Sequence, residues 1–563
     1  MHNRSMRNQW VLWKLQFRAL YRVFFLRLVD LDLLSADADL TRLIGQFAVI
    51  FCTFSFVISI PLLLMNGATL VMENAWMFEH FLIETAMTVA GLIVVLNWDA
   101  AFPDKLDVLV LAPLPVRKSM LFLAKVSALF AAPTLAVVAL NSFSGLLWPL
   151  LFRADNSGFV GMLRALPAYW FTIFAAAGFL VLTVLTLQGL AANLLPRQMF
   201  LRLSAVLQAA IMCTLVSVYL LEPSLESPAA LTSPQNQRLL AWLPSYWFLA
   251  LFNQLNGSMH PALAPLAARA WAGLGLSILG TCTALLLCYF RLMPQIVEQP
   301  DILPRARFAS WSPRFGSPLT EALTLFSLRT LLRSRQHRMI LSFYLGIGLT
   351  IIIGYVNTTP AGLRSAKAAI STSFLFASIL MMILTVAAFR VVASLPISLP
   401  ANWIIRITQV RAARAYRNGV RFSWLALAVT PVLFVVLGLV PFIYPWHNAI
   451  EHSGLMLCLG ILLVELCLFT FPKIPFTCSY LPGKAQIHFV FWAGMLIFLR
   501  LLTGAARFEE RLLNRPLNCL VAILLIASAA LGIRYLGRSR AAVTEEMLFE
   551  EKDPAQITQL KLS

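Results

Sequence analysis

Long apolar runs alternate with short polar segments along the whole chain. A helix needs roughly 20 mostly apolar residues to cross a bilayer, and about twelve runs meet that length, most without an interior charge. This pattern predicts an all-α, polytopic membrane protein with about twelve transmembrane helices. The runs lie near residues 43–65, 79–98, 119–142, 167–190, 203–221, 266–290, 339–355, 368–389, 419–443, 449–471, 487–503 and 517–536.

The composition agrees with that pattern. Hydrophobic residues make up 60% of the 563 residues and charged residues only 12%, whereas a typical soluble domain has about 25% charged residues. The eight cysteines form no CxxC pair and mostly fall inside apolar runs. They are therefore expected to be small apolar residues, and no metal site is predicted.

The basic residues are distributed unevenly around the runs. The first 42 residues contain scattered Lys and Arg but no separate apolar core, which argues against a signal peptide and for a cytoplasmic amino terminus. With twelve crossings, roughly three quarters of the 44 Lys and Arg residues lie on the cytoplasmic side. We therefore expect a multi-pass protein of the cell (inner) membrane with both termini cytoplasmic. A loop near 504–516 departs from the rule, because Arg507, Arg511 and Arg515 fall outside.

The net charge of +19 has a simple source in these cytoplasmic loops. Positive loops fix topology and contact anionic headgroups. Membrane lipids are therefore expected partners, and nucleic acid is not.

A Pro, Ser and Arg-rich stretch, "ILPRARFASWSPRFGSP" (302–318), separates six runs from six. A basic amphipathic helix is predicted before each half. The first lies within 8–28, where bases recur every four residues among Trp and Phe, and the second runs from Ser317 to about Arg338. The expected organisation is a cytoplasmic segment (1–42), a first six-span half (43–301), a linker with a basic helix (302–338), a second half (339–536) and a cytoplasmic tail (537–563).

The second cytoplasmic turn of each half follows one pattern. The turns "LAPLPVRKS" (111–119) and "ASLPISLPANWIIRITQVRAARAYR" (393–417) both hold Leu-Pro followed by a β-branched residue, and both are flanked by bases. The next turns, "NLLPRQ" (193–198) and "FPKIPFTCSYLPGKAQ" (471–486), also match in kind. These correspondences favour a diverged tandem duplication of a six-span unit.

The segment "PDKLDVLVLAPLPVRKSMLFLAK" (103–125) resembles the loop between the second and third spans of type-2 ATP-binding-cassette (ABC) exporter permeases. In that family the loop is a short coupling helix that lies in a groove of the cytosolic ATPase subunit. The resemblance covers nearly all of the first half and the first four spans of the second. It implies an ABC-type ATPase as partner and five docking residues, namely Leu114, Pro115, Val116, Arg117 and Lys118.

Two further features enter through the same resemblance. The stretch "RLLAWLPSYWFLALFNQLNG" (238–257) is similar to the half-inserted external hairpin that caps the pathway in such exporters. Its candidate interfacial residues are Trp242, Pro244, Tyr246, Trp247 and Phe248. The second half lacks an equivalent aromatic stretch, and its Leu395-Pro396-Ile397 loop has no acidic segment before it.

The residue chemistry of the first loop suits docking. Leu114 and Val116 can fill a groove, two bases can steer the encounter, and Pro115 has a fixed φ. An ordinary turn that obeys the positive-inside rule remains the alternative for both loops.

The chain contains no GxxxxGK[ST] phosphate loop. It is therefore expected to be no enzyme and to hold no cofactor, because a partner subunit would use the ATP. The resulting hypothesis is an exporter permease for a hydrophobic or amphipathic cargo. A second copy of the chain is a further candidate partner.

Two other functional classes stay open. An ion- or proton-coupled secondary transporter needs ionisable groups at membrane depth, for which Glu465 and then Glu84 are the candidates. A lone span glutamate can equally be a neutral acid that hydrogen-bonds a neighbouring helix. An intramembrane enzyme is disfavoured, because "HNAIEH" (447–452) has HxxxEH spacing and not the HxxEH of a zinc site.

Overall fold

The computed structural model describes most of the chain as α-helix. The described residues up to Cys288 form one compact unit, unit 1, and those from Ser317 onward form a second, unit 2. The described ranges are 13–25, 40–64, 75–98, 117–151, 158–221, 228–288, 317–358, 367–397, 413–442, 445–469, 471, 473–478, 488–513 and 515–543.

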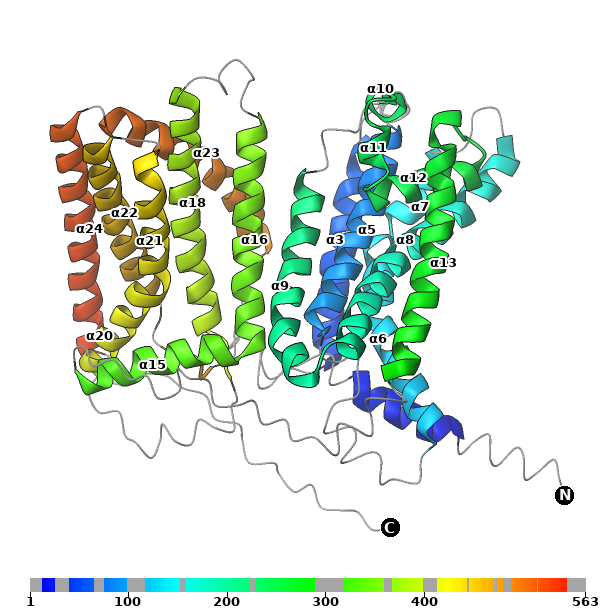
Figure 1. Ribbon diagram of the computed structural model, residues 1–563, viewed down its shortest axis with the longest axis horizontal. Coiled ribbons are helices and arrows are strands. Elements are labelled where there is room, and N and C mark those ends of the chain that lie inside the picture. The colour runs from blue at the N-terminus through cyan, green and yellow to red at the C-terminus, as the bar shows by residue number, and fades with distance from the viewer. Residues whose placement is uncertain are drawn as a thin grey trace, which may run out of the picture. The chain divides into compact units, whose positions relative to one another are not determined.

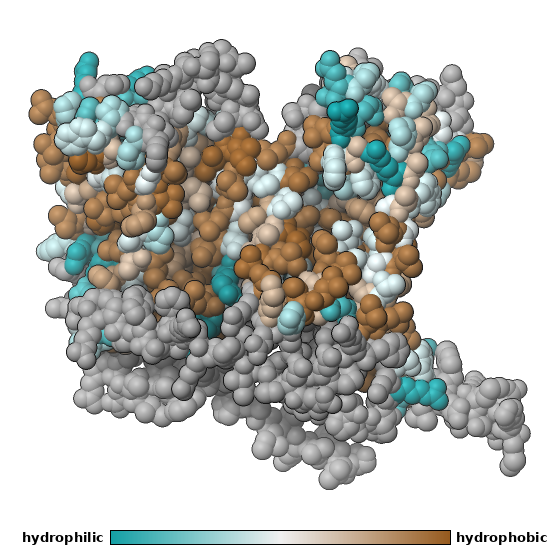
Figure 2. Space-filling view, in the orientation of Figure 1, coloured by the Kyte–Doolittle hydropathy of each residue, from teal (hydrophilic) through white to brown (hydrophobic). Residues whose placement is uncertain are grey.

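Ten helices within these ranges are long and apolar enough to cross a bilayer. They confirm the prediction of an all-α, multi-pass membrane protein, and each coincides with one of the apolar runs in the sequence. The space-filling view shows hydrophobic side chains over the middle of each unit, as lipid-facing surfaces require (Figure 2). The other two runs correspond to α3, whose described apolar stretch is Ala48–Ser59, and to α23.

Unit 1 is organised around α8, which packs against α5 on one side and α13 on another. Its buried face is rich in Ala, and such small side chains let neighbouring helices approach closely. The helices of unit 1 are α3 (Leu40–Leu64), α5 (Ala75–Leu96), α6 (Lys118–Leu140), α7 (Ser144–Leu151), α8 (Gly158–Leu194), α9 (Arg197–Leu221), α10 (Pro228–Thr232), α11 (Gln237–Leu240), α12 (Pro244–Asn256) and α13 (Ala264–Leu287).

Unit 2 has its core between α18, α20 and α22, where Phe376, Phe389 and Trp424 are fully buried. A π-helical turn at Leu425–Val429 joins α20 to α21 without interrupting the helical path. The helices of unit 2 are α15 (Pro318–Arg333), α16 (Arg335–Thr358), α18 (Lys367–Ala393), α20 (Ala413–Trp424), α21 (Thr430–Leu439), α22 (Trp446–Phe469), α23 (His488–Leu513) and α24 (Pro516–Val543).

An amphipathic helix marks one end of each unit, which we call the base; the opposite end is the far end. In unit 1 this helix is at residues 13–25, and in unit 2 it is α15, which runs across the ends of the spanning helices (Figure 1). The predicted start of α15 is confirmed, because the Ser317 hydroxyl accepts a hydrogen bond from the Thr320 N–H and Pro318 occupies the first helical position. The helix ends earlier than predicted: the chain turns at Ser334, and α16 begins at Arg335.

The predicted external loop at 504–516 is wrong for most of its length, because α23 continues to Leu513. The residues of α23 that face the protein recur with helical spacing, and they are Leu502, Ala506, Glu509 and Leu513. Arg507 and Arg511 lie on the exposed face between them. An amphipathic helix accommodates these arginines, which explains why the charge count did not fit a simple loop.

Candidate functional site

The first candidate site is the base of unit 1, where the Leu-Pro-Val loop leads into α6. Leu114, Pro115 and Val116 lie outside the described residues. Arg117 is exposed directly before α6, and Lys118 is the first residue of that helix. The backbone therefore leads from the predicted docking residues straight into a membrane-spanning helix.

The helix at residues 13–25 packs on the first turns of α6. Leu20 and Phe24 are buried there, and the Lys125 ammonium lies 5.6 Å from the centre of the Phe24 ring. The α6 side of this contact is formed by Met120, Leu121, Ala124 and Ala128. The start of α6 is thus held by a second helix within a few residues of the loop.

The surface of helix 13–25 suits a membrane interface. Trp13, Phe17, Tyr21 and Phe25 stack in succession, with ring centres 5.4, 6.4 and 5.9 Å apart. Its bases Lys14, Arg18 and Arg22 are exposed. A helix with aromatic and basic faces of this kind is stable in the plane of the headgroups.

The base of unit 2 repeats this arrangement with α15 and α20. The two helices approach closely at Gly419, where a Cβ atom would lie 2.6 Å from the Leu323 side chain. The hydroxyls of Ser423 and Ser327 lie 3.5 Å apart further along the contact. In both units, therefore, an amphipathic helix packs against the helix that follows a candidate coupling loop.

The second Leu-Pro loop is tied to its own unit. Leu395 is only 6% exposed, Pro396 is buried, and Ile397 is 48% exposed. The Phe476 N–H donates to the Ala393 carbonyl (2.8 Å), and the Ile397 N–H donates to the Phe476 carbonyl (3.1 Å). Leu395 is therefore packed inside unit 2, and Ile397 is the exposed apolar residue of this loop.

The stretch that resembles an external hairpin lies at the far end of unit 1. It consists of two short helices, α11 and α12, and Pro244 is the first residue of α12. Trp242 is 83% exposed, whereas Tyr246 and Phe248 are fully buried and Trp247 is partly buried. Tyr246 and Phe248 are thus covered by protein, because α12 is seated among α5, α8 and α13, and the depth of the four aromatics in the membrane stays a prediction.

Specific contacts hold α12 at both ends. Near its start, the Tyr246 ring stacks on the His80 ring of α5 with centres 4.0 Å apart. Near its end, the Arg164 side chain of α8 donates to the Leu255 carbonyl (2.5 Å). Gly257 ends the helix with φ +88°, in the left-handed region, and any Cβ there would lie 2.9 Å from the Arg164 guanidinium.

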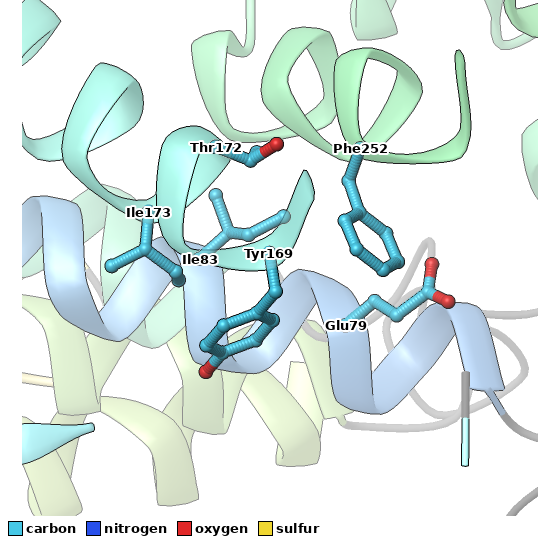
Figure 3. A pocket seen from close by; sticks show the side chains of 6 residues that line it. All are labelled: Glu79, Ile83, Tyr169, Thr172, Ile173 and Phe252. Atoms are coloured by element: carbon cyan, nitrogen blue, oxygen red, sulfur yellow. The ribbon is translucent and has the colours of Figure 1, made fainter. Parts of the chain in front are cut away.

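A buried carboxyl group lies beneath α12. The side-chain amide of Asn253 donates to Glu79 of α5 over 3.0 Å, and both residues are buried. Figure 3 shows Glu79 beside Phe252 among the side chains that line a small pocket. The other lining residues are Ile83, Tyr169, Thr172 and Ile173.

The predicted intramembrane carboxylate Glu465 forms an ion pair near the base of unit 2. Both of its oxygens accept from Arg421 of α20, Oε1 from Nε at 2.5 Å and Oε2 from Nη2 at 3.0 Å. Glu465 is hydrogen-bonded to a neighbouring helix, as the neutral-acid alternative expected, but its partner is a guanidinium, so an ion pair stands in place of that acid. Arg421 was overlooked, although both residues lie close to the base ends of their predicted spans.

The other predicted carboxylate, Glu84, lies in the far half of α5. It is buried, and its Oε2 is 3.9 Å from His80 Nδ1 on the next turn. His80 and Glu84 lie one turn apart on one face of α5, whereas Glu79 points in another direction around the helix, toward Asn253 of α12. Three ionisable residues are thus gathered in this part of unit 1, where the sequence interpretation had singled out one.

Unit 2 has its own buried pair at the far end. His452 Nδ1 lies 2.6 Å from Glu509 Oε1, and the Thr372 hydroxyl donates to the neighbouring Glu510 over 2.8 Å. These contacts join α23 to α22 and α18. They place α23 against α18, α22 and α24, as α12 lies against α5, α8 and α13.

The described residues contain no group of three or more His, Cys, Asp or Glu side chains that could hold a metal ion. In the "HNAIEH" stretch His447 is exposed while His452 is buried against Glu509, so the two rings do not share a site. Comparisons of the chain with protein-family models, with curated proteins and with solved structures find no match.

Proposed function

We propose that this chain is the membrane-spanning permease subunit of an ABC-type exporter, driven by a separate ATPase subunit. The proposal places both termini on the cytoplasmic side of the cell (inner) membrane, with the base of each unit facing the ATPase. The cargo would be hydrophobic or amphipathic. The five residues from Leu114 to Lys118 would dock in the ATPase.

One observation carries the proposal: the helix that follows each candidate coupling loop is held at its first turns by an amphipathic helix. In unit 1 this pair is α6 with helix 13–25, and in unit 2 it is α20 with α15. A push on the loop would therefore move a spanning helix and its interfacial partner together. A plain turn needs no such support.

The arrangement of Glu465 weighs against the rival secondary transporter at that position. A coupling carboxylate must gain and lose its ion, whereas protonating Glu465 would leave the buried guanidinium of Arg421 without its counter-charge. The observation that favours the rival is the His452–Glu509 pair, since a buried imidazole beside a carboxylate can relay a proton. Proton coupling through that pair is therefore the second candidate function.

The test is to purify the tagged full-length chain from its own membranes, with and without the proteins that accompany it. The chain alone should hydrolyse no ATP, and the intact complex should contain a second subunit and hydrolyse ATP. Reconstituted into vesicles, the complex should keep its ATP hydrolysis when a protonophore dissipates the proton gradient. Two results together would favour the second candidate. The chain would co-purify with no ATPase, and vesicles containing it would quench a pH-sensitive dye under an imposed proton gradient only when His452 is present.

A further inference from the structure

The last turns of α23 are fixed to the far end of unit 2 by their inner face. Glu509 lies against His452 of α22, and the Thr372 hydroxyl of α18 donates to Glu510. Both partners lie near the starts of their helices, which are at the far end (Figure 1). The last turns of α23 are therefore held at this end of the bundle, where the chain passes through Arg515 into α24.

The outer face of the same turns is basic. Arg507 and Arg511 lie one turn apart on the exposed face of α23, and Arg515 is exposed just after the helix ends. Phe508 precedes Arg511 by three positions, so the two side chains are neighbours on the helix surface, and Phe508 is more than half exposed. An exposed aromatic ring thus lies beside a row of guanidinium groups.

This row lies at the edge of a membrane-spanning stretch. The spanning stretch of α24 begins at Pro516, the residue directly after Arg515, and Leu517 is exposed in its first turn. A helix face with arginines and an aromatic ring at this depth suits the plane of the headgroups, where the ring reaches the acyl chains. In the orientation proposed above this end is external, where the positive-inside rule predicts few bases, so topology does not account for the row.

We propose that Arg511 and Arg515 bind the phosphate groups of anionic phospholipids in the leaflet at the far end. A planar guanidinium binds a phosphate through paired hydrogen bonds, and each base near the membrane surface adds to the attraction for anionic lipid. Phe508 lies among the upper acyl chains of the bound lipid. The exposed ring and the adjacent spanning stretch favour a lipid over an acidic protein segment as the occupant.

The surface does not depend on the proposed transport function, since it involves neither the Leu-Pro-Val loop nor an ATPase. Its two faces have different roles. The inner face ties α23 to α18 and α22 through carboxylates, and the outer face ties it to the membrane through arginines. Bound lipid therefore keeps the last turns of α23 in the plane of the headgroups.

Photo-crosslinking tests the proposal at the site itself. The photoreactive aromatic p-benzoylphenylalanine replaces Phe508 in the full-length chain, which is reconstituted into nanodiscs with equal amounts of dioleoyl phosphatidylglycerol and dioleoyl phosphatidylcholine. Mass spectrometry should show about fivefold or more phosphatidylglycerol adduct relative to phosphatidylcholine adduct. Arg511→Gln with Arg515→Gln should bring the ratio close to one, because both charges that select the anionic headgroup are lost.

Three controls separate headgroup selection from folding and from general lipid contact. The Gln variant should melt at the wild-type temperature in detergent, because both arginines are exposed. The same probe at Leu531, on the exposed apolar face of α24, should yield the two lipids equally in both backgrounds. Arg511→Lys with Arg515→Lys keeps the charge and should keep an excess of phosphatidylglycerol.

Three results would overturn the proposal. The first is an equal yield of the two lipids at position 508 in the chain with both arginines. The second is an excess of phosphatidylglycerol that survives the Gln substitutions. The third comes from crosslinking in the chain's own membranes before purification, where an adduct with another protein in place of lipid would show that a protein covers this surface.

Discussion

The two units solve one problem, that of keeping polar side chains inside an apolar helix bundle, in different ways. Unit 1 satisfies its buried Glu79 with a neutral amide, that of Asn253. Unit 2 pairs buried carboxylates with basic side chains, Glu465 with Arg421 and Glu509 with His452. Glu79 thus relies on an amide, whereas Glu465 and Glu509 rely on close basic partners, to which the His80–Glu84 contact of unit 1, at 3.9 Å, is only a looser counterpart.

This difference predicts how the units respond to substitution. An amide that donates to a carboxyl group contributes modestly, because folding only exchanges one hydrogen-bond partner for another. A buried charge pair contributes little net stability, yet breaking it is expensive, since the remaining charge has no partner in a low-dielectric medium. Unit 2 should therefore be the more sensitive unit to single polar substitutions.

The largest effect is expected at Arg421. Arg421→Leu should destabilise the protein by about 3–5 kcal/mol, because Glu465 would remain buried without its partner. Arg421→Leu combined with Glu465→Leu should recover most of the loss. Thermal unfolding of the purified protein in detergent measures both, with exposed Arg333→Leu as the control. A single variant that unfolds with the wild type would show that the pair does not hold α20 to α22.

The next effect is expected at the far end of unit 2. Glu509→Leu should cost about 1–3 kcal/mol, because the His452 ring loses its hydrogen-bond partner. A double-mutant cycle with His452→Leu should give a coupling energy of about 0.5–3 kcal/mol. Arg507→Gln, on the exposed face of the same helix, is the matched control. Strictly additive effects would mean that α23 is not fixed through this pair.

A smaller effect is expected at the corresponding contact of unit 1. Asn253→Leu should cost about 1–2 kcal/mol, because Glu79 loses the amide donor that satisfies it in the buried site. Glu79→Gln should cost less, since its amide oxygen can still accept from Asn253. The comparison between the units breaks down if Asn253→Leu proves as damaging as Arg421→Leu in the same unfolding assay.

The smallest effect is expected at the end of α12. Gly257→Ala should cost about 1 kcal/mol, because φ is +88° and the new Cβ would press on Arg164. Gly275→Ala in α13 is the matched control, since no atom lies within 4 Å of its added Cβ. That control should be neutral or slightly stabilising. Equal melting temperatures for the two variants would contradict the proposed clamp between Arg164 and α12.

The sequence predicts most of the spanning helices well, because the apolar length needed to cross a bilayer is a strong constraint. Its errors have physical causes. The predicted span at 167–190 was too short, because Pro167 was taken as its start, whereas α8 begins at Gly158 and carries Pro167 inside the helix. Likewise, the loop at 504–516 was inferred from the break in hydropathy between two apolar runs, whereas α23 continues to Leu513 as an amphipathic helix with arginine on its exposed face.

The candidate sites were predicted less completely, because pairing depends on depth and rotation that hydropathy does not reveal. Glu465 was found as an isolated acid, while its partner Arg421 was assigned to the topology count. Tyr246 and Phe248 were placed at the interface from their residue type, although the helix that carries them is packed on both sides. Comparing the depths of charged residues in neighbouring spans would have suggested the Arg421–Glu465 pair.

The central claim is that the Leu-Pro-Val loop of unit 1 docks an ATPase subunit. Its most direct test is co-purification of that subunit with Leu114→Asp, compared with Leu194→Asp, the same change at an exposed residue of the next turn at the base of unit 1. Leu114→Asp should lose the ATPase, because a carboxylate buried in an apolar groove costs several kcal/mol. Leu194→Asp should retain it, and both chains should melt at the wild-type temperature. A Leu114→Asp complex that stays intact and hydrolyses ATP at the wild-type rate would contradict the account.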